Sequence, residues 1–259
     1  MSYTVHPLPF AGVALCIFAG IVGGSDGDAL LYDGALTDLG PGSVVSVCPG
    51  KALVVRESSA ELYDGAFTVL ATGQNLKGSL SSTGSAVVTG DAFSLLYDGS
   101  FHDLGLFRAT CTNAGGWVGG SLAGNAAVRQ SGGTLLVMLY GASSGEVEAV
   151  NDSGLCAVDY VVDGKVKAFT CDALNGLSPI VYFGPSSYRD LKAVAVNSSG
   201  TVVGTADGVP WVKPRNGFAT RPQVTPGWTV KTVTGIDDSG TLCGTACFEG
   251  TTVPVLLVP

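Results

Sequence analysis

A Tyr-Asp-Gly triplet occurs three times in the first hundred residues and gives the chain a period. The copies begin at Tyr32, Tyr63 and Tyr97, in steps of 31 and 34 residues. Each has Leu or Phe two positions after its glycine and Leu three positions later. Self-similarity at this spacing is the signature of a repeat architecture, in which each copy is one supersecondary unit.

A second landmark, a turn of the form Asn/Asp-x-x-Gly before a Val-rich run, extends the repeat over the whole chain. Asn or Asp closes such a turn with its own side chain, and Gly takes the left-handed conformation that other residues resist. Each copy therefore predicts a hairpin turn. The copies begin at Asn113, Asn151, Asn197 and Asp237, and the glycine alone recurs at Gly20, Gly50 and Gly84.

Between the two landmarks, apolar runs divide each repeat of about 37 residues into four short strands, A to D. In the third repeat these are residues 76–81, 85–90, 93–97 and 101–104. Four antiparallel strands recurring seven times predict an all-β, seven-bladed β-propeller with four-stranded blades. A β-sandwich would not repeat itself, and a β-helix has a shorter unit. We expect residues 1–259 to form this single domain.

The seventh repeat lacks its last strand. It has strand A at residues 232–236, strand B at 241–246 and strand C at 253–258, and then the chain ends. Residues 5–8, Val-His-Pro-Leu, match the D strand at residues 101–104. We therefore predict that the N-terminal strand completes the C-terminal blade and closes the ring. Pro7 is tolerated there if strand D is the outer edge of its blade.

Several segments resemble HAF-type repeats, in which a His/Asp-Ala-Phe strand leads to Asp-Leu-Gly and then to Asn-x-x-Gly-x-Val-Val-Gly. The matching segments are residues 91–93, 38–40, 103–105 and 196–204. The resemblance implies a β-propeller of the kind found in bacterial or phage proteins. It carries no catalytic residues to transfer.

Charge and cysteine content narrow the classes of partner. The net charge of -8, with no long Lys/Arg cluster, disfavours nucleic acid. The seven cysteines include no C-x-x-C pair and predict no disulfide framework. They fit small buried strand residues, although Cys243 and Cys247 are close enough to leave a pairing open.

The apolar stretch at residues 11–24 is the one segment that invites a targeting or membrane interpretation. It has no preceding Lys or Arg, so we do not expect a signal peptide, and it is too short and Gly-rich for a membrane helix. The compartment stays open between a phage virion, a cell surface and the extracellular space.

The two histidines and one serine motif are the obvious catalytic suspects. His6 and His102 occupy the same position of strand D in different repeats, which favours a structural role. Residues 23–27 match G-x-S-x-G, but no helix follows, as a nucleophile elbow requires. We expect no catalytic residue here.

Acidic residues give no clear site either. Asp26, Asp28, Asp237 and Asp238 lack the spacing of a calcium loop and fit solvated turns. The A strands, which would line a central channel, are mostly Ala, Val, Thr and Ser, so paired acids are not expected there. We expect no metal and no cofactor.

The variable crossovers between blades are the favoured binding region, because loops on a rigid scaffold carry recognition. They hold aromatic and Arg residues typical of interface anchors. We therefore expect a non-enzymatic module that recognises a protein or glycan through this face, as a phage virion or tail component or a bacterial surface protein. A lectin, and a hydrolase or lyase with a central-channel site, are the alternatives. The predicted binding residues are Tyr182, Phe183, Tyr188, Arg189, Arg221 and Trp228.

Overall fold

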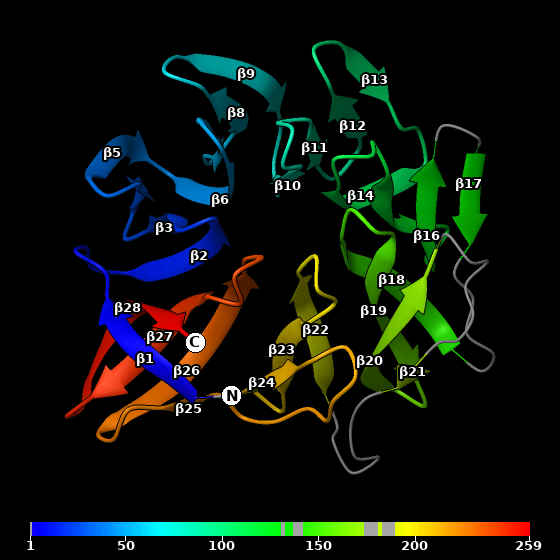
Figure 1. Ribbon diagram of the computed structural model, residues 1–259. Helices are drawn as coiled ribbons and strands as arrows, with labels where there is room; N and C mark the ends of the chain where they lie inside the picture. Colours follow the sequence, from blue (N-terminus) through cyan, green and yellow to red (C-terminus); the bar gives the residue numbers. More distant parts are fainter. Residues whose placement is uncertain (1, 131–132, 137–141, 174–180, 183–189) are drawn as a thin grey trace.

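The computed structural model describes residues 2–130, 133–136, 142–173, 181–182 and 190–259. Across these ranges the chain forms seven sheets arranged as blades around a central axis (Figure 1). In blades one to six the first strand of each sheet lies nearest the axis and later strands lie farther out, and in blade seven the strand at residues 228–236 lies nearest the axis. The predicted seven-bladed β-propeller is confirmed.

The first four blades each contain four antiparallel strands. Blade one contains β2 (Val13–Phe18), β3 (Ile21–Ser25), β4 (Asp28–Tyr32) and β5 (Leu36–Pro41). Blade two contains β6 (Ser43–Cys48), β7 (Lys51–Val55), β8 (Ser59–Tyr63) and β9 (Phe67–Thr72). Blade three contains β10 (Lys77–Leu80), β11 (Ala86–Thr89), β12 (Ser94–Tyr97) and β13 (Phe101–Asp103). Blade four contains β14 (Phe107–Thr112), β15 (Val118–Leu122), β16 (Asn125–Gln130) and β17 (Gly133–Leu136).

Blade five also contains four antiparallel strands, whereas blades six and seven differ in strand number. Blade five contains β18 (Ala142–Val150), β19 (Leu155–Val162), β20 (Lys165–Asp172) and β21 (Val181–Tyr182). Blade six contains β22 (Leu191–Val196), β23 (Val202–Ala206) and β24 (Val209–Lys213). Blade seven contains β25 (Gln223–Val224), β1 (Ser2–Pro7), β28 (Thr251–Val258), β27 (Leu242–Phe248) and β26 (Trp228–Ile236), from the rim inward.

Two blades differ in detail from the predicted four strands: blade seven has its four predicted strands and the additional β25, and the described part of blade six has three. After β24 the chain turns at Pro214, whose carbonyl accepts the Gly217 N–H at 3.1 Å. It then returns to make only one bridge, in which Val212 and Thr220 exchange backbone hydrogen bonds of 2.8 and 2.9 Å. In the described chain, strand D of blade six is thus reduced to a single bridging pair.

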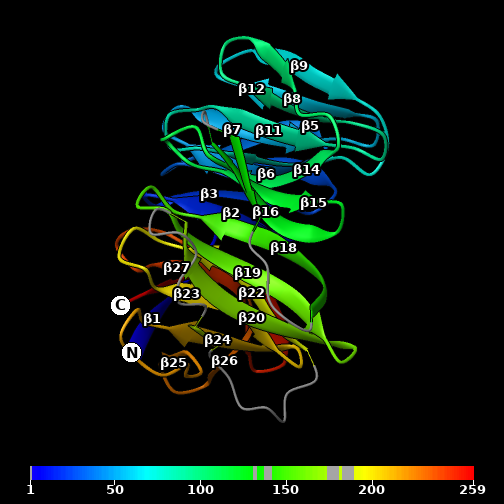
Figure 2. The ribbon, with the colours of Figure 1, turned by 90° about the vertical axis from the view of Figure 1, so that its right-hand side faces the viewer.

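The predicted ring closure is confirmed. Strand β1 pairs antiparallel with β28, from Thr4 opposite Val258 to Pro7 opposite Val255. Figures 1 and 2 both show the two chain ends side by side at this blade. The short β25 adds a parallel partner to Ser2 and Tyr3. Pro7 lies outside the segment that pairs with β25, so the N–H that proline lacks is not needed for a hydrogen bond to that strand.

The seven turn glycines adopt the predicted left-handed conformation. Their φ angles all lie between +71° and +86°, a region that a side chain strains. Each turn joins strand A to strand B on one face of the disc, hereafter the turn face; the crossovers lie on the opposite face, hereafter the crossover face. The glycines are Gly20, Gly50, Gly84, Gly116, Gly154, Gly200 and Gly240.

Glycines inside several B strands have a different cause, which is close approach of the A strand. The β22–β23 register shifts at a bulge between Ala193 and Ala195. A Cβ built on Gly204 would lie 1.9 Å from the carbonyl oxygen of Lys192 in the first of these strands. No side chain fits there, so the Val-Val-Gly pattern of the repeat is a packing requirement.

Hydrogen bonds join every pair of neighbouring blades, and apolar side chains fill the seams between them. In one such seam, Val87 of blade three packs with Phe107 and Val118 of blade four. The ring is therefore a rigid frame for loops on both faces. The joining bonds run from Ser25 to Gly42, Leu80 to Ser46, Thr89 to Ala109, Asn113 to Asn151, Ala193 to Asp159, Asn197 to Asp237 and Thr234 to Ala14.

Candidate functional site

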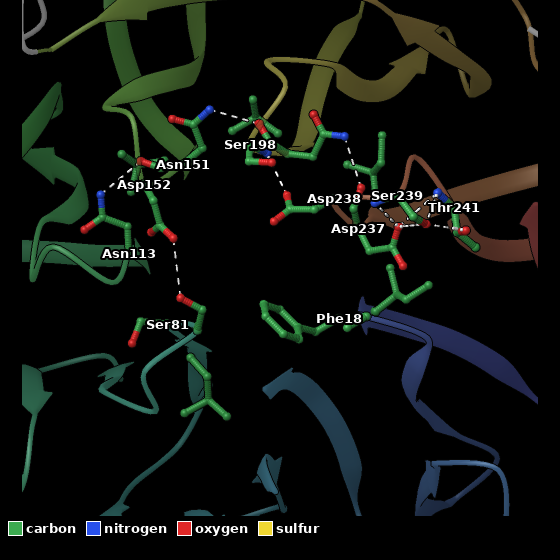
Figure 3. Close-up of a pocket in the computed structure, with 18 of the residues that line it drawn as sticks. Phe18, Ser81, Asn113, Asn151, Asp152, Ser198, Asp237, Asp238, Ser239 and Thr241 are labelled. Atoms are coloured by element: carbon green, nitrogen blue, oxygen red, sulfur yellow. Dashed lines mark hydrogen bonds between the residues drawn. The ribbon is translucent and has the colours of Figure 1, made fainter. Parts of the chain in front are cut away.

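The central channel opens on the turn face through a cavity of about 550 Å³, lined by residues from six blades. Figure 3 shows this mouth, with Phe18 from the end of β2 facing the same opening as the polar turns of blades four to seven. Among the residues that line it in the described structure, none is Lys, Arg or His. The mouth therefore combines a polar, weakly acidic wall with an aromatic one.

A relay of asparagine side chains holds this mouth in shape. Asn113 donates from Nδ2 to the carbonyl of Asn151 at 3.0 Å, and Asn151 donates to that of Asn197 at 2.9 Å. Asn197 in turn donates to the carbonyl of Asp237 at 3.0 Å (Figure 3). Each amide is buried and satisfied. These asparagines therefore join neighbouring blades, in addition to capping their own turns as predicted.

The aspartates at the mouth are also engaged in turn capping. Asp237 is 6% exposed and accepts from the Thr241 N–H and from Ser239. Asp238 accepts the Ser198 N–H of the preceding blade at 2.8 Å (Figure 3). Within the described ranges, no three His, Cys, Asp or Glu side chains come together to hold a metal ion.

A second pocket, of about 430 Å³, lies at the crossover face and is lined by blades four, five and six. Gly124, in the turn between β15 and β16, places it at that face. Its walls carry charges of both signs, unlike the turn-face mouth. We call this cavity the crossover pocket. Its charged residues are Arg108 on β14, Glu146 and Glu148 on β18, Asp159 on β19 and Lys192 on β22.

Strand pairing brings the acids of the crossover pocket together. Glu146 lies directly opposite Asp159 in the β18–β19 ladder, and like charges at opposed positions repel. A bulge between Val147 and Ala149 shifts the register where Glu148 stands. Three carboxyl groups from two neighbouring strands therefore share one pocket.

Burial and mutual repulsion keep protons on two of these carboxyls near neutral pH. Burial raises the pKa of Glu148 to about 7, and Glu146 adds to the rise while Lys77 and Lys192 oppose it. Burial also raises the pKa of Asp159 to about 8, although the Ala193 N–H that it accepts at 2.9 Å lowers it. Perturbed acids in a cleft are a physical indication of a functional site.

The structure describes only part of the predicted binding set. Tyr182 belongs to β21, opposite Phe169 of β20, whereas Phe183, Tyr188 and Arg189 lie outside the described residues. The crossover that contains them leads directly into β22, which carries Lys192.

The other two predicted residues lie at blade seven. Arg221 is exposed just before β25, at the rim. Trp228 is half-buried at the start of β26, with its ring 5.0 Å from that of Phe248. Neither lines the crossover pocket.

The expectation that the A strands carry no paired acids is wrong for blade five. Glu146 and Glu148 lie on an A strand, and Asp159 faces them from β19. One signal in the sequence could have revealed this. Asp159 follows its turn glycine by five positions, where other repeats have Ser25, Val55, Thr89, Ser121, Thr205 and Thr245. A single acid at a position of small or apolar residues indicates a local function.

The histidines do not form a catalytic arrangement. His102 Nε2 lies 2.9 Å from Asp98 Oδ1 and 3.0 Å from Ser100 Oγ, and all three side chains are exposed. A Ser-His-Asp triad needs the two different ring nitrogens for its two partners. His6, at the matching strand position, lies opposite Leu256 as His102 lies opposite Leu96.

The serine motif and the cysteines are likewise structural. Ser25 ends β3, and its hydroxyl donates to the Gly42 carbonyl at 2.9 Å, so no nucleophile elbow forms. All seven cysteines are free, which answers the question of a Cys243–Cys247 pair.

Comparisons with known proteins identify the fold alone. No family model matches the chain, and no characterised protein matches it by sequence. Among solved structures, the extracellular domain of BT4673 from B. thetaiotaomicron has a TM-score of 0.65 at 9% identity, covering 98% of this chain and 39% of that one. The chain thus spans about two fifths of the length of that structure.

Two further solved structures match over nearly their full lengths. Streptogramin B lyase has a TM-score of 0.64 at 12% identity, covering 98% of both chains. YCF48 bound to D1 peptide has a TM-score of 0.57 at 10% identity, covering 99% of this chain and 95% of that one. Among the residues described, no helix is long and apolar enough to cross a membrane.

Proposed function

We propose that the protein is a non-enzymatic binding module whose crossover face recognises a partner protein by taking one of its cationic side chains into the crossover pocket. The observation that carries the proposal is the pair of desolvated carboxyls, Glu148 and Asp159, in an open pocket. The fold admits this role, since a propeller of similar shape, YCF48, is solved with a bound peptide.

The chemistry of the pocket favours a cation over an anion. Ionised carboxylates that have lost water are unstable unless an opposite charge pairs with them. Lys192 is already near Asp190, with Nζ 3.5 Å from Oδ2, and is half exposed. A lysine or arginine side chain entering from the partner would supply the missing positive charge to Glu148 and Asp159.

This mode of binding predicts a specific pH dependence. A bound cation lowers the pKa of both carboxyls, so binding releases protons and strengthens as pH rises through 7 to 8. A partner that instead presents a carboxylate or phosphate would bind more weakly over the same range. The sign of the dependence therefore identifies the charge of the partner group.

The test uses a library of short basic and acidic peptides, screened by fluorescence polarisation at about pH 6 and about pH 8.5. We expect basic peptides to bind, more tightly at the higher pH, and Glu148→Gln with Asp159→Asn to abolish that gain. Asp152→Asn, on the turn face, is the matched control and should bind as wild type does. Selection of acidic peptides would refute the proposal, and so would binding that is the same in the pocket variants as in the wild type.

The setting we propose is a phage particle or a bacterial surface. Seven free cysteines suit a chain that matures without disulfides, in a reducing cytoplasm. A small share of charged residues suits a protein held within a larger assembly. Co-purification of the full chain with virions, or with the cell surface, tests this part independently of the pocket.

A hydrolase or lyase is the second candidate, because carboxyls with pKa values near neutrality suit general acid–base catalysis. Glu148 and Asp159 would be the acid and base, with Arg108 in the pocket lining to stabilise negative charge. Turnover of a panel of chromogenic esters and glycosides, lost in Glu148→Gln, would support catalysis. Absence of turnover at every pH tested would contradict it.

A further inference from the structure

A small pocket of about 180 Å³ lies on the turn face between blades two and three. It shares no lining residue with the turn-face mouth or with the crossover pocket. Its volume equals that of roughly six water molecules at about 30 Å³ each, which is the size of one sugar ring. The side chains that matter for its chemistry are Lys51, Asp64, Thr68, Ser85, Tyr97 and Asp98.

Two copies of the Tyr-Asp-Gly turn build this pocket. Asp64 comes from the turn of blade two, and Tyr97 and Asp98 come from the turn of blade three. Lys51, at the start of β7, reaches across the turn glycine of the next blade, because a Cβ on Gly84 would lie 2.7 Å from its Nζ. The repeat thus places a cation and two carboxylates around one cavity.

These charged groups are not fully paired within the protein. In the part of the chain that the structure describes, Lys51 Nζ and the Asp64 carboxylate have no hydrogen bond or ion pair. Asp98 uses Oδ1 for Ser100 and His102, at 3.1 and 2.9 Å. The described residues leave Asp98 Oδ2 without a donor, so the pocket presents one charged donor and two charged acceptors, beside the hydroxyls of Thr68 and Ser85.

A saccharide satisfies this set better than an ion does. A metal cation is repelled by Lys51, and an anion by Asp64 and Asp98. Sugar hydroxyls both donate and accept, so one ring can give hydrogen bonds to the carboxylates and take one from the ammonium. Tyr97 also lines the pocket.

We propose that this pocket binds a single neutral saccharide unit, as a free sugar or as the end of a glycan, through Lys51, Asp64 and Asp98. The site is independent of the crossover pocket, and neither proposal depends on the other. It is also specific to one seam. Blade one has Ile21 in the position of Lys51, so the preceding seam has the Tyr-Asp-Gly turns without the cation.

The test is a glycan array followed by titration of the full chain with a panel of monosaccharides, observed in ¹H–¹⁵N NMR spectra. The glycine amides of the pocket, Gly84 and Gly99, should shift with dissociation constants on the order of millimolar. Lys51→Met and Asp64→Asn should each weaken binding by roughly 10-fold or more, because each removes a charge-assisted hydrogen bond.

The matched control is Asp33→Asn, which makes the same change in the equivalent turn of blade one and should leave binding unaltered. A panel in which no sugar shifts Gly84 or Gly99 would overturn the proposal. So would a sugar that binds with undiminished affinity to the Lys51→Met and Asp64→Asn variants. Because folded variants give recognisable spectra, loss of binding is distinguished from loss of structure.

Discussion

Glu148→Gln should stabilise the protein in a strictly pH-dependent way. Burial raises the pKa of Glu148 from 4.5 to about 7, helped by Glu146 and opposed by Lys77 and Lys192. At about 1.4 kcal/mol per pKa unit, ionising this group destabilises the folded state by about 3 kcal/mol, an upper value for a half-buried side chain. The unfolded chain loses its proton first, so the loss accumulates as pH rises from 4.5 to about 7 and then stays constant.

The assay is urea unfolding followed by tryptophan fluorescence at about pH 4, 6 and 8. The variant and the wild type should have equal free energies of unfolding at the lowest pH, and the variant should be more stable by up to about 3 kcal/mol at the highest. Glu57→Gln, an exposed glutamate, is the control and should follow the wild type throughout. A variant that gains nothing at high pH, or that loses stability there, would show that Glu148 is not desolvated as described.

Changes at three other places in the chain test which contacts hold the propeller together. Deleting residues 1–10 removes the buried Tyr3 and Leu8 along with β1, and should lower the melting temperature by roughly 10 °C or more in calorimetry; an unchanged melt would refute the closure. Asn151→Ala should lower the free energy of urea unfolding by about 2 kcal/mol, and Asn151→Asp by less, because it keeps the accepting oxygen; equal losses would contradict the capping role. Gly204→Ala should cost about 3 kcal/mol in the same measurement, and an unshifted midpoint would show that the A strand can yield.

The blades and the closing strand could be predicted because their signals are local and repeated. A turn glycine such as Gly200 needs its backbone conformation whatever surrounds it, and the strands on either side follow from it. The match of residues 5–8 to another D strand needed only the repeat register. Sequence pattern is sufficient where one local cause acts in every copy.

The acids of the crossover pocket could not be predicted in the same way. Glu146 faces Asp159 because of how β18 and β19 pair, and two bulges in that ladder set the register. A shift of one residue would turn the side chains to the other face. Strand β25 was equally invisible, because residues 223–224 carry no repeat signature and pair in parallel with a segment more than two hundred positions away.

The shared seventh blade also determines the order in which the molecule can assemble. Strands of blades one to four pair with near neighbours in the chain and can form as synthesis proceeds, one unit at a time. Strand β1 precedes the strands of blades one to six, whereas its partner β28 follows them, so this pairing must wait until all the intervening strands have been made. Joining such distant segments is slow because a long loop has to close. We therefore expect the pairing of β1 with β28 to form late in folding, and until it forms β28 presents an open edge.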